Sequence, residues 1–206
     1  MDPRVTIVGA TGAVGEATRQ ILEEFAFPMS SLRLCASERS FGKKVNFAGQ
    51  DITIEGANRK VFSESDIVFF AAGGGVSKTL APIAAEEGAL VIDKSSTWRM
   101  DPTVPLVIPE INPEDIGSHQ GIISSPNCST IVMLMAISPL HKSNPIKRII
   151  VDTYQSASGA GGKGILELDT QIRSILAGQT PEHSTFPHSL AFNVLPHVEN
   201  FSENDY

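Results

Sequence analysis

The chain has 206 residues, and a hydrophobic content of 41% is that of a packed globular protein. A formal charge of −7 and a pI near 5.2 argue against nucleic acid or an anionic membrane surface as the main partner. Two distant cysteines, Cys35 and Cys128, give neither a disulfide framework nor a metal-ligand spacing. The start of the chain shows no signal-peptide pattern, and the longest apolar stretch is too short to span a bilayer. We therefore expect a soluble, cytoplasmic protein.

The first predicted unit is a strand, a glycine-rich turn and a helix. A β-branched run over residues 5–8 is followed by GATGAVG at 9–15, and apolar spacing predicts a helix over 16–25. This order is a G-x-x-G-x-x-G variant of the dinucleotide-binding fingerprint, in which glycines let backbone N–H groups approach a pyrophosphate. A plain tight turn is the alternative, and we place it behind the dinucleotide site.

The second predicted strand, residues 32–36, contains Cys35, which we expect in the core. It ends at Ser37, Glu38, Arg39 and Ser40. At this point of a Rossmann fold an acid suits the ribose 2′-hydroxyl of NAD, whereas arginine suits the 2′-phosphate of NADP. Both residue types are present, and Arg39 with its two flanking serines favours NADP.

Further strands and helices alternate along the next part of the chain. We expect a hairpin from residues 44–47 and 51–54, a buried strand over 66–72, a helix over 76–87 capped by Gly88, and a strand over 89–93. Three glycines at 73–75 follow a strand, where a cofactor lies in open α/β sheets; a flexible turn is the alternative. The alternation predicts a Rossmann-type doubly wound, mostly parallel α/β sheet.

Arg99 also follows a predicted strand. It is either a surface arginine lying over Trp98 or a bidentate clamp for phosphate or carboxylate.

Cys128 lies at the N-terminal end of a predicted helix. The segment SSPNCST at 124–130 lies between a strand-like run and a strongly apolar helical run over 131–137, and Pro126 stops the strand. A cysteine there faces unpaired N–H groups and the positive end of the helix dipole, which favours the nucleophilic thiolate. The plainer alternative is a small buried side chain.

The pattern changes after residue 140. A long strand is expected over 146–155, then a glycine-rich segment over 156–164 that lets backbone approach a ligand, and a helix over 165–176. We therefore expect a Rossmann domain at 1–130 and part of an α+β catalytic and dimerisation domain at 131–206.

Four segments together resemble the aspartate-semialdehyde dehydrogenase family. They are GATGAVG at 9–15, PNCST at 126–130, YQSASGAG at 154–161 and AFNVLPH at 191–197. The resemblance implies a homodimeric enzyme of lysine, threonine and methionine biosynthesis, in which NADPH reduces aspartyl phosphate to aspartate semialdehyde with release of phosphate. It also implies an acyl-thioester on Cys128, substrate orientation by Gln155, and phosphate contacts from Asn127 and Arg99. The NADP-binding residues implied by the resemblance are Gly9, Thr11, Gly12, Ala13, Val14, Arg39, Ser40, Ser158 and Gly159.

The residue chemistry is consistent with that resemblance. A thiolate displaces phosphate from an acyl phosphate, and hydride reduces the thioester to the aldehyde. The reaction also needs a general acid/base, and the family's catalytic histidine lies further downstream than Tyr206. We therefore expect a partial second domain, and a 206-residue chain that is inactive alone. The five histidines (His119, His141, His183, His188 and His197) are expected to be structural or exposed.

Two other functions remain open from the sequence. One is a related acyl-phosphate reductase for a longer substrate, such as N-acetylglutamyl phosphate. The other is a non-catalytic dinucleotide-binding or oligomerising fragment.

Overall fold

The computed structural model describes residues 2–196 and 198. The chain forms two compact units, Met1–Thr153 and Tyr154–Tyr206, and each is described by itself. The division at residues 130 and 131 that we predict from the sequence falls inside the helix α4 (Cys128–Ser143) and stays a prediction.

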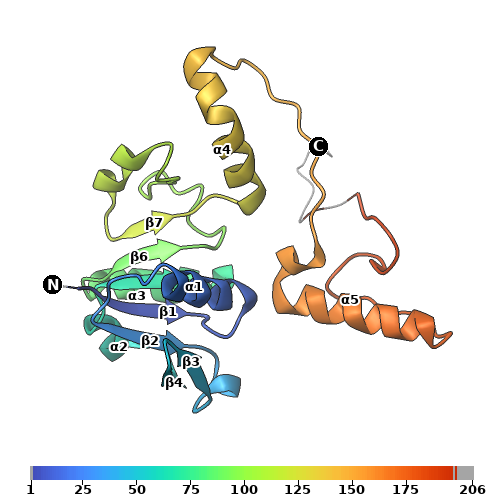
Figure 1. The fold of residues 1–206 in the computed structure, drawn as a ribbon, viewed down its shortest axis with the longest axis horizontal. Coiled ribbons are helices and arrows are strands. Elements are labelled where there is room, and N and C mark those ends of the chain that lie inside the picture. The colour runs from blue at the N-terminus through green and yellow to red at the C-terminus, as the bar shows by residue number, and fades with distance from the viewer. Residues whose placement is uncertain (1, 197, 199–206) are drawn as a thin grey trace. The chain divides into compact units, whose positions relative to one another are not determined.

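A seven-stranded sheet with the order β3-β4-β2-β1-β5-β6-β7 forms the centre of the first unit (Figure 1). Its strands are β1 (Arg4–Val8), β2 (Ser31–Cys35), β3 (Lys44–Phe47), β4 (Gln50–Glu55), β5 (Ile67–Phe70), β6 (Leu90–Asp93) and β7 (Ile122–Ser124). Neighbouring strands run parallel except in the pair β3 and β4, which is the predicted hairpin. The predicted Rossmann-type fold is therefore confirmed.

Helices bury both faces of this sheet because successive residues of a strand point to opposite sides. On one face, Val5 and Ile7 of β1 pack with Leu22 of α1. On the other, Val8 packs in a cluster with Phe62 of α2 and Ala81 of α3. The helical elements of this unit are α1 (Ala13–Glu24), η1 (Glu38–Ser40), α2 (Arg59–Ser63), α3 (Gly74–Glu86), η2 (Pro113–Ser118) and α4. Parallel strands end at one edge of the sheet, and the loops at that edge carry the candidate site.

The predicted strand over residues 146–155 is wrong. The structure shows irregular backbone there, and Ile149, Ile150 and Val151 are exposed. A β-branched run becomes a strand only where a neighbouring strand pairs with it, and no described segment does so.

The second unit contains the short helix η3 (Ala157–Ala160) and α5 (Gly161–Leu176). α5 begins earlier than the predicted residue 165, so part of the glycine-rich segment is helical. A Cβ on Gly164 would lie 2.4 Å from the Ala157 carbonyl oxygen, which explains why a glycine is needed where the helix meets η3. No helix within the described ranges is long and apolar enough to cross a membrane.

Candidate functional site

The turn between β1 and α1 has the backbone geometry of a phosphate-binding loop. Gly9 adopts φ +88°, and its N–H donates to the Cys35 carbonyl at 2.8 Å. A Cβ on Gly15 would lie 2.2 Å from the Gly9 carbonyl oxygen, so only glycine allows α1 to pack this close to the turn. The N-cap of α1 is Gly12, which has no side chain to cap the helix. The first-turn N–H groups of α1 are therefore suited to an anion.

A cavity of about 730 Å³ opens beside this turn. It is bounded by the segments that follow β1, β2 and β5 and by the first turns of α3. The lining includes Gly9, Thr11, Gly12, Ser37, Glu38, Arg39, Phe41, Gly56, Ala57, Ala71, Gly73, Val76 and Leu80. Its volume is typical of small-ligand sites, and with the glycine turn it fits a dinucleotide.

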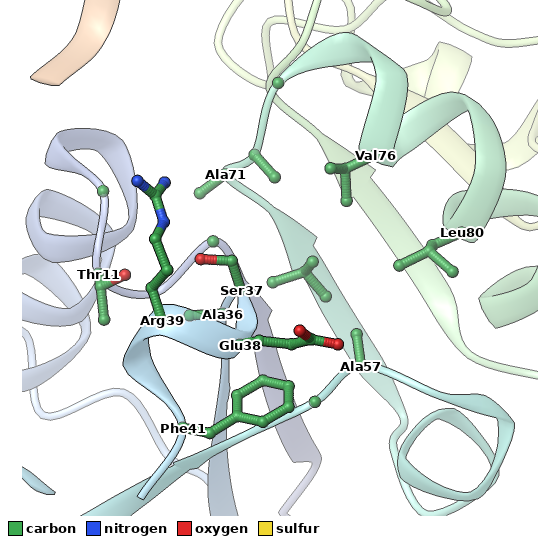
Figure 2. Close-up of a pocket in the computed structure, with 16 residues that line it drawn as sticks. Thr11, Ala36, Ser37, Glu38, Arg39, Phe41, Ala57, Ala71, Val76 and Leu80 are labelled. Atoms are coloured by element: carbon green, nitrogen blue, oxygen red, sulfur yellow. The ribbon is translucent and has the colours of Figure 1, made fainter. Parts of the chain in front are cut away.

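The side chains of Glu38 and Arg39 point in different directions inside this cavity. Figure 2 shows the Arg39 side chain on the same side of the cavity as Thr11, and the Glu38 side chain pointing toward Ala57. Phe41 forms another part of the wall, and a Cβ on Gly56 would lie 2.9 Å from its ring. The arginine and the acid that left the cofactor ambiguous in the sequence thus both border the cavity.

The predicted cofactor residues fall into three groups. Gly9, Thr11, Gly12 and Arg39 line the cavity. Ala13 and Val14 form the first turn of α1, and Ser40 is buried at the end of η1; among the described residues these three are not part of the lining. Ser158 and Gly159 belong to the second unit.

Sequence reasoning did not identify Phe41, Gly56, Ala57, Val76 and Leu80 as lining residues. These residues are apolar or glycine, and their patterns are those of ordinary strands, helices and turns. Only the parallel sheet order brings them to one cavity, so the sequence offered no local signal.

Cys128 is the first residue of α4 and is exposed. The N-cap is Asn127, whose side-chain oxygen accepts a hydrogen bond from Ser129 N at 2.9 Å. The predicted cysteine at a helix start is therefore confirmed. Cys35 instead lies in β2 with no exposed surface, and its burial raises the pKa of the thiol to about 12. The two thiols differ strongly in access and hence in reactivity.

Arg99 is half-buried, and its guanidinium donates hydrogen bonds to two backbone carbonyls. Its Nε donates to the Ser125 carbonyl at 3.0 Å, and one terminal nitrogen donates to the Lys94 carbonyl at 3.2 Å. Ser125 N in turn donates to the Asp93 carbonyl at 2.9 Å. Arg99 is thus tied to the segment that leads to Cys128, and its other N–H groups make no hydrogen bond within the described part of the chain.

Gln155 lies in the second unit, beside a cavity of about 670 Å³. The lining residues are Gln155, Ser156, Ala157, Leu168, Leu190, Phe192, Asn193 and Val194. The Ser158 hydroxyl lies 2.5 Å from that of Ser156, and a Cβ on Gly159 would lie 3.8 Å from Gln155 Oε1. The structure therefore brings Gln155, Ser158 and Gly159 together.

The four described histidines are exposed. Nδ1 of His119 accepts from Gly121 N and Nδ1 of His141 from Ile146 N, each at 3.0 Å, and His183 contacts the Phe186 carbonyl. These local roles agree with the structural or exposed placement that we predict, and His197 lies outside the described residues. Within 2–196 and 198, no cluster of three acidic, histidine or cysteine side chains is arranged to hold a metal.

A glycine turn, an open cavity at the carboxyl edge of a parallel sheet and covering helices define a Rossmann-type dinucleotide-binding protein. The family described as "Semialdehyde dehydrogenase, NAD binding domain" matches residues 4–119, and "Semialdehyde dehydrogenase, dimerisation domain" matches residues 137–206. The chain belongs to the semialdehyde dehydrogenase family, and the resemblance found in the sequence is confirmed.

Individual relatives agree with this placement. An aspartate-semialdehyde dehydrogenase of Aquifex aeolicus is 49% identical over 210 residues, covering 100% of this chain and 62% of the relative. The Bacillus subtilis enzyme of that name is 44% identical over 209 residues, covering 98% of this chain and 60% of the relative. The chain thus spans about three-fifths of the length of these curated relatives.

Solved structures give the same result. Aspartate semialdehyde dehydrogenase II of Vibrio cholerae, complexed with ASA, superposes with a TM-score of 0.96 at 45% identity, covering 100% of this chain and 62% of that one. A Candida albicans aspartate semialdehyde dehydrogenase with NADP gives a TM-score of 0.59 at 26% identity, covering 71% of this chain and 48% of that one.

Proposed function

We propose that this protein acts as an aspartate-semialdehyde dehydrogenase. It would use NADPH to convert L-aspartyl 4-phosphate to L-aspartate 4-semialdehyde and phosphate, as a homodimer. The observation that carries the proposal is the exposed Cys128 thiol at the first position of α4, beside the segment to which Arg99 is bonded. The names of the relatives and the ASA complex of the Vibrio cholerae enzyme support the substrate. The match to a dimerisation domain supports the homodimer.

The side chains of the first unit have distinct tasks in this reaction. The Cys128 thiolate attacks the acyl carbon, the bond from that carbon to the phosphate oxygen breaks, and an enzyme thioester forms. The free N–H groups of Arg99 hold the phosphate as it leaves. Because the Asn127 side-chain oxygen is occupied by Ser129 N, the amide nitrogen is left to donate to the substrate. Gln155 of the second unit is proposed to orient the substrate.

The cavity in the first unit would hold the cofactor. Its glycine turn would receive the pyrophosphate, and Arg39 would contact the 2′-phosphate that distinguishes NADP from NAD. Bound NADPH supplies the hydride that reduces the thioester to the aldehyde. The NADP complex of the Candida albicans relative supports this choice of cofactor.

Substitution of Arg39 tests the choice of cofactor. Arg39→Ala should weaken NADP by about 10- to 100-fold, because a charge-assisted hydrogen bond contributes about 1.5–3 kcal/mol, and should leave NAD nearly unchanged. Titration calorimetry with both cofactors measures the two constants. Lys43→Ala removes a nearby positive charge outside the cavity lining and is the control. Equal losses for NADP and NAD would show that Arg39 is structural and that Glu38 reads the ribose.

The reaction itself is tested with the full-length protein, by which we mean this chain extended to the length of its curated relatives, of which these 206 residues span about three-fifths. NADPH oxidation is followed with aspartyl phosphate and, separately, with N-acetylglutamyl phosphate. We expect turnover with aspartyl phosphate, and expect Cys128→Ser to abolish it while NADPH binding remains. Preference for the acetylated substrate would indicate the related reductase instead. NADPH binding without turnover on either substrate would indicate a dinucleotide-binding protein with no such activity.

A further inference from the structure

A buried carboxylate that the proposed chemistry does not use lies next to the candidate phosphate site. Asp93, the last residue of β6, has no exposed surface, and no described lysine or arginine forms an ion pair with it. Its two oxygens accept three hydrogen bonds: from the Ser77 hydroxyl at 2.5 Å, from Ser95 N at 2.9 Å and from the Ser95 hydroxyl at 2.6 Å. A buried carboxylate is costly without such donors, so Asp93 and these groups depend on one another.

The Ser77 hydroxyl is the point at which three elements meet. It is fully buried on α3, and while it donates to Asp93 it accepts a hydrogen bond from Trp98 Nε1 at 2.9 Å. A second link lies beside it, because the Thr97 hydroxyl donates to the Gly74 carbonyl at 3.0 Å. The loop of residues 94–99 after β6 is therefore fixed to the first turns of α3 by side chains.

Arg99 lies at the end of the loop that these bonds hold. Arg99 directly follows Trp98, and its guanidinium reaches the Ser125 carbonyl. The backbone carbonyl of Asp93 accepts from Ser125 N at 2.9 Å, while the Asp93 side chain holds the loop that carries Arg99. The Asp93 side chain therefore holds the loop that carries Arg99, and the Asp93 backbone holds Ser125, to which Arg99 donates.

We propose that Asp93, acting through Ser77 and Trp98, is a positioning residue that holds the Arg99 guanidinium in place for the phosphate group of the substrate. The proposal rests on the proposed function, in which Arg99 binds that phosphate. Asp93 and Trp98 touch neither the substrate nor the cofactor in this arrangement. Their loss should weaken phosphate binding while leaving the dinucleotide cavity and the Cys128 thiol as they are.

Protection of Cys128 by inorganic phosphate measures this directly on the full-length protein. Iodoacetamide labelling reports on Cys128, because Cys35 is buried and its pKa is raised to about 12. Trp98→Phe keeps an aromatic ring at this position and removes the indole N–H that donates to Ser77, together with one ring of the indole. We expect the phosphate concentration for half-protection to rise about tenfold in Trp98→Phe. It should rise further in Asp93→Asn, because the new amide N–H groups would face Ser77 and Ser95, which donate to the carboxylate in the wild type.

Three additional readouts separate positioning from general damage. The labelling rate without phosphate and the Kd for NADP should stay near wild type in Trp98→Phe, and the melting temperature should fall only by what the lost ring volume costs, since Trp98 packs against the core. Asp101→Asn is the matched control, since Asp101 accepts from Thr103 N at 2.9 Å and from the Thr103 hydroxyl at 2.7 Å in the same local pattern. Asp101 is not linked to α3 by any described hydrogen bond, so this variant should keep wild-type protection.

The outcomes distinguish the two proposals. If phosphate protects wild type and Trp98→Phe at the same concentration, the positioning role is refuted while the proposed function stands. If phosphate does not protect wild type at all, the phosphate site of the proposed function fails and the positioning role fails with it. Should Asp93→Asn not fold, Trp98→Phe still decides, because it leaves the carboxylate and its Ser77 and Ser95 donors in place.

Discussion

The two units of the chain are stabilised in different ways. In residues 1–153, strands of a seven-stranded sheet pair through their backbones, and two apolar clusters cover its faces. In residues 154–206, two side chains on one face of α5 hold a loop that has no regular structure. Gln171 Oε1 accepts from Leu190 N at 2.8 Å and from Ala191 N at 2.9 Å. Glu167 accepts from Ser184 N at 3.0 Å and Thr185 N at 2.5 Å.

This difference indicates where each unit is vulnerable. Backbone pairing is distributed over many residues, so the loss of one side chain removes a small part of it. A loop held by two side chains loses about half of its hydrogen bonds to the helix when one of the two is replaced. The loop also ends in Leu190, Phe192 and Asn193, which border the cavity beside Gln155. We therefore expect the shape of that cavity to depend on α5 side chains that do not line it.

The largest effect is expected for Gln171→Ala. Gln171 is 1% exposed and also donates to the Glu182 carbonyl at 3.1 Å. Its loss leaves buried N–H groups without partners, which should destabilise the second unit by about 2–4 kcal/mol. Faster hydrogen exchange at the Leu190 and Ala191 amides measures the loss. Gln179→Ala, in an exposed position just after the same helix, should leave that exchange unchanged. Wild-type protection in Gln171→Ala would show that apolar packing holds the loop instead.

Gly15→Ala tests the glycine of the first unit at which an added Cβ would have the least room. The new Cβ would approach the Gly9 carbonyl oxygen to 2.2 Å, and a backbone atom in a packed turn cannot move away without cost. We expect a loss of about 1–3 kcal/mol in the free energy of unfolding and impaired NADP binding, measured by thermal unfolding and calorimetry. Gly162→Ala in α5, where no atom outside the local helix backbone lies within 4 Å of the new Cβ, is the control and should be tolerated. Intact NADP binding in Gly15→Ala would argue against the turn as the pyrophosphate site.

The same contrast explains what could be predicted from the sequence. Apolar runs bounded by glycines gave the strands and helices of the first unit, because their local pattern matches their burial. The run at 146–155 is also rich in β-branched residues, yet no described strand pairs with it, so the apolar pattern alone predicted a strand that does not form. Gly9, Arg39 and Cys128 could be found because each lies in a short motif. The roles of Asp93 and Gln171 could not, because the links that give them those roles, from Asp93 to Ser77 and from Gln171 to Leu190 and Ala191, span 16 to 20 residues.

Acid should release the loop of the second unit through Glu167. Burial alone would raise the pKa of Glu167, but hydrogen bonds from Thr185 and Ser184 outweigh it and lower the pKa from 4.5 to about 2. A lowered pKa in the folded state means that the stabilisation is complete above pH 4.5 and is lost as the pH falls toward about 2. The Ser184 and Thr185 amide chemical shifts should titrate with a midpoint near 2 in wild type and not at all in Glu167→Gln. A midpoint at the usual value would show that these hydrogen bonds do not persist in solution.

The smallest effect is expected for a buried polar pair of the first unit. The Thr6 hydroxyl in β1 lies 2.7 Å from that of Ser65, and the Ser65 hydroxyl donates to the Val61 carbonyl at 2.7 Å. Thr6→Val removes one hydroxyl but leaves Ser65 bonded to Val61, so no buried donor loses its acceptor.

The backbone of Thr6 stays paired with β2 and β5 in the variant, because its register partners are Arg33 and Val68. We therefore expect a loss of about 1 kcal/mol or less in the free energy of unfolding, measured by urea denaturation. Thr6→Ala, which also removes a methyl group from the core, should cost more. A loss in Thr6→Val as large as that in Gln171→Ala would mean that single side chains matter as much in the sheet as in the loop. The distinction between the two units would then have to be abandoned.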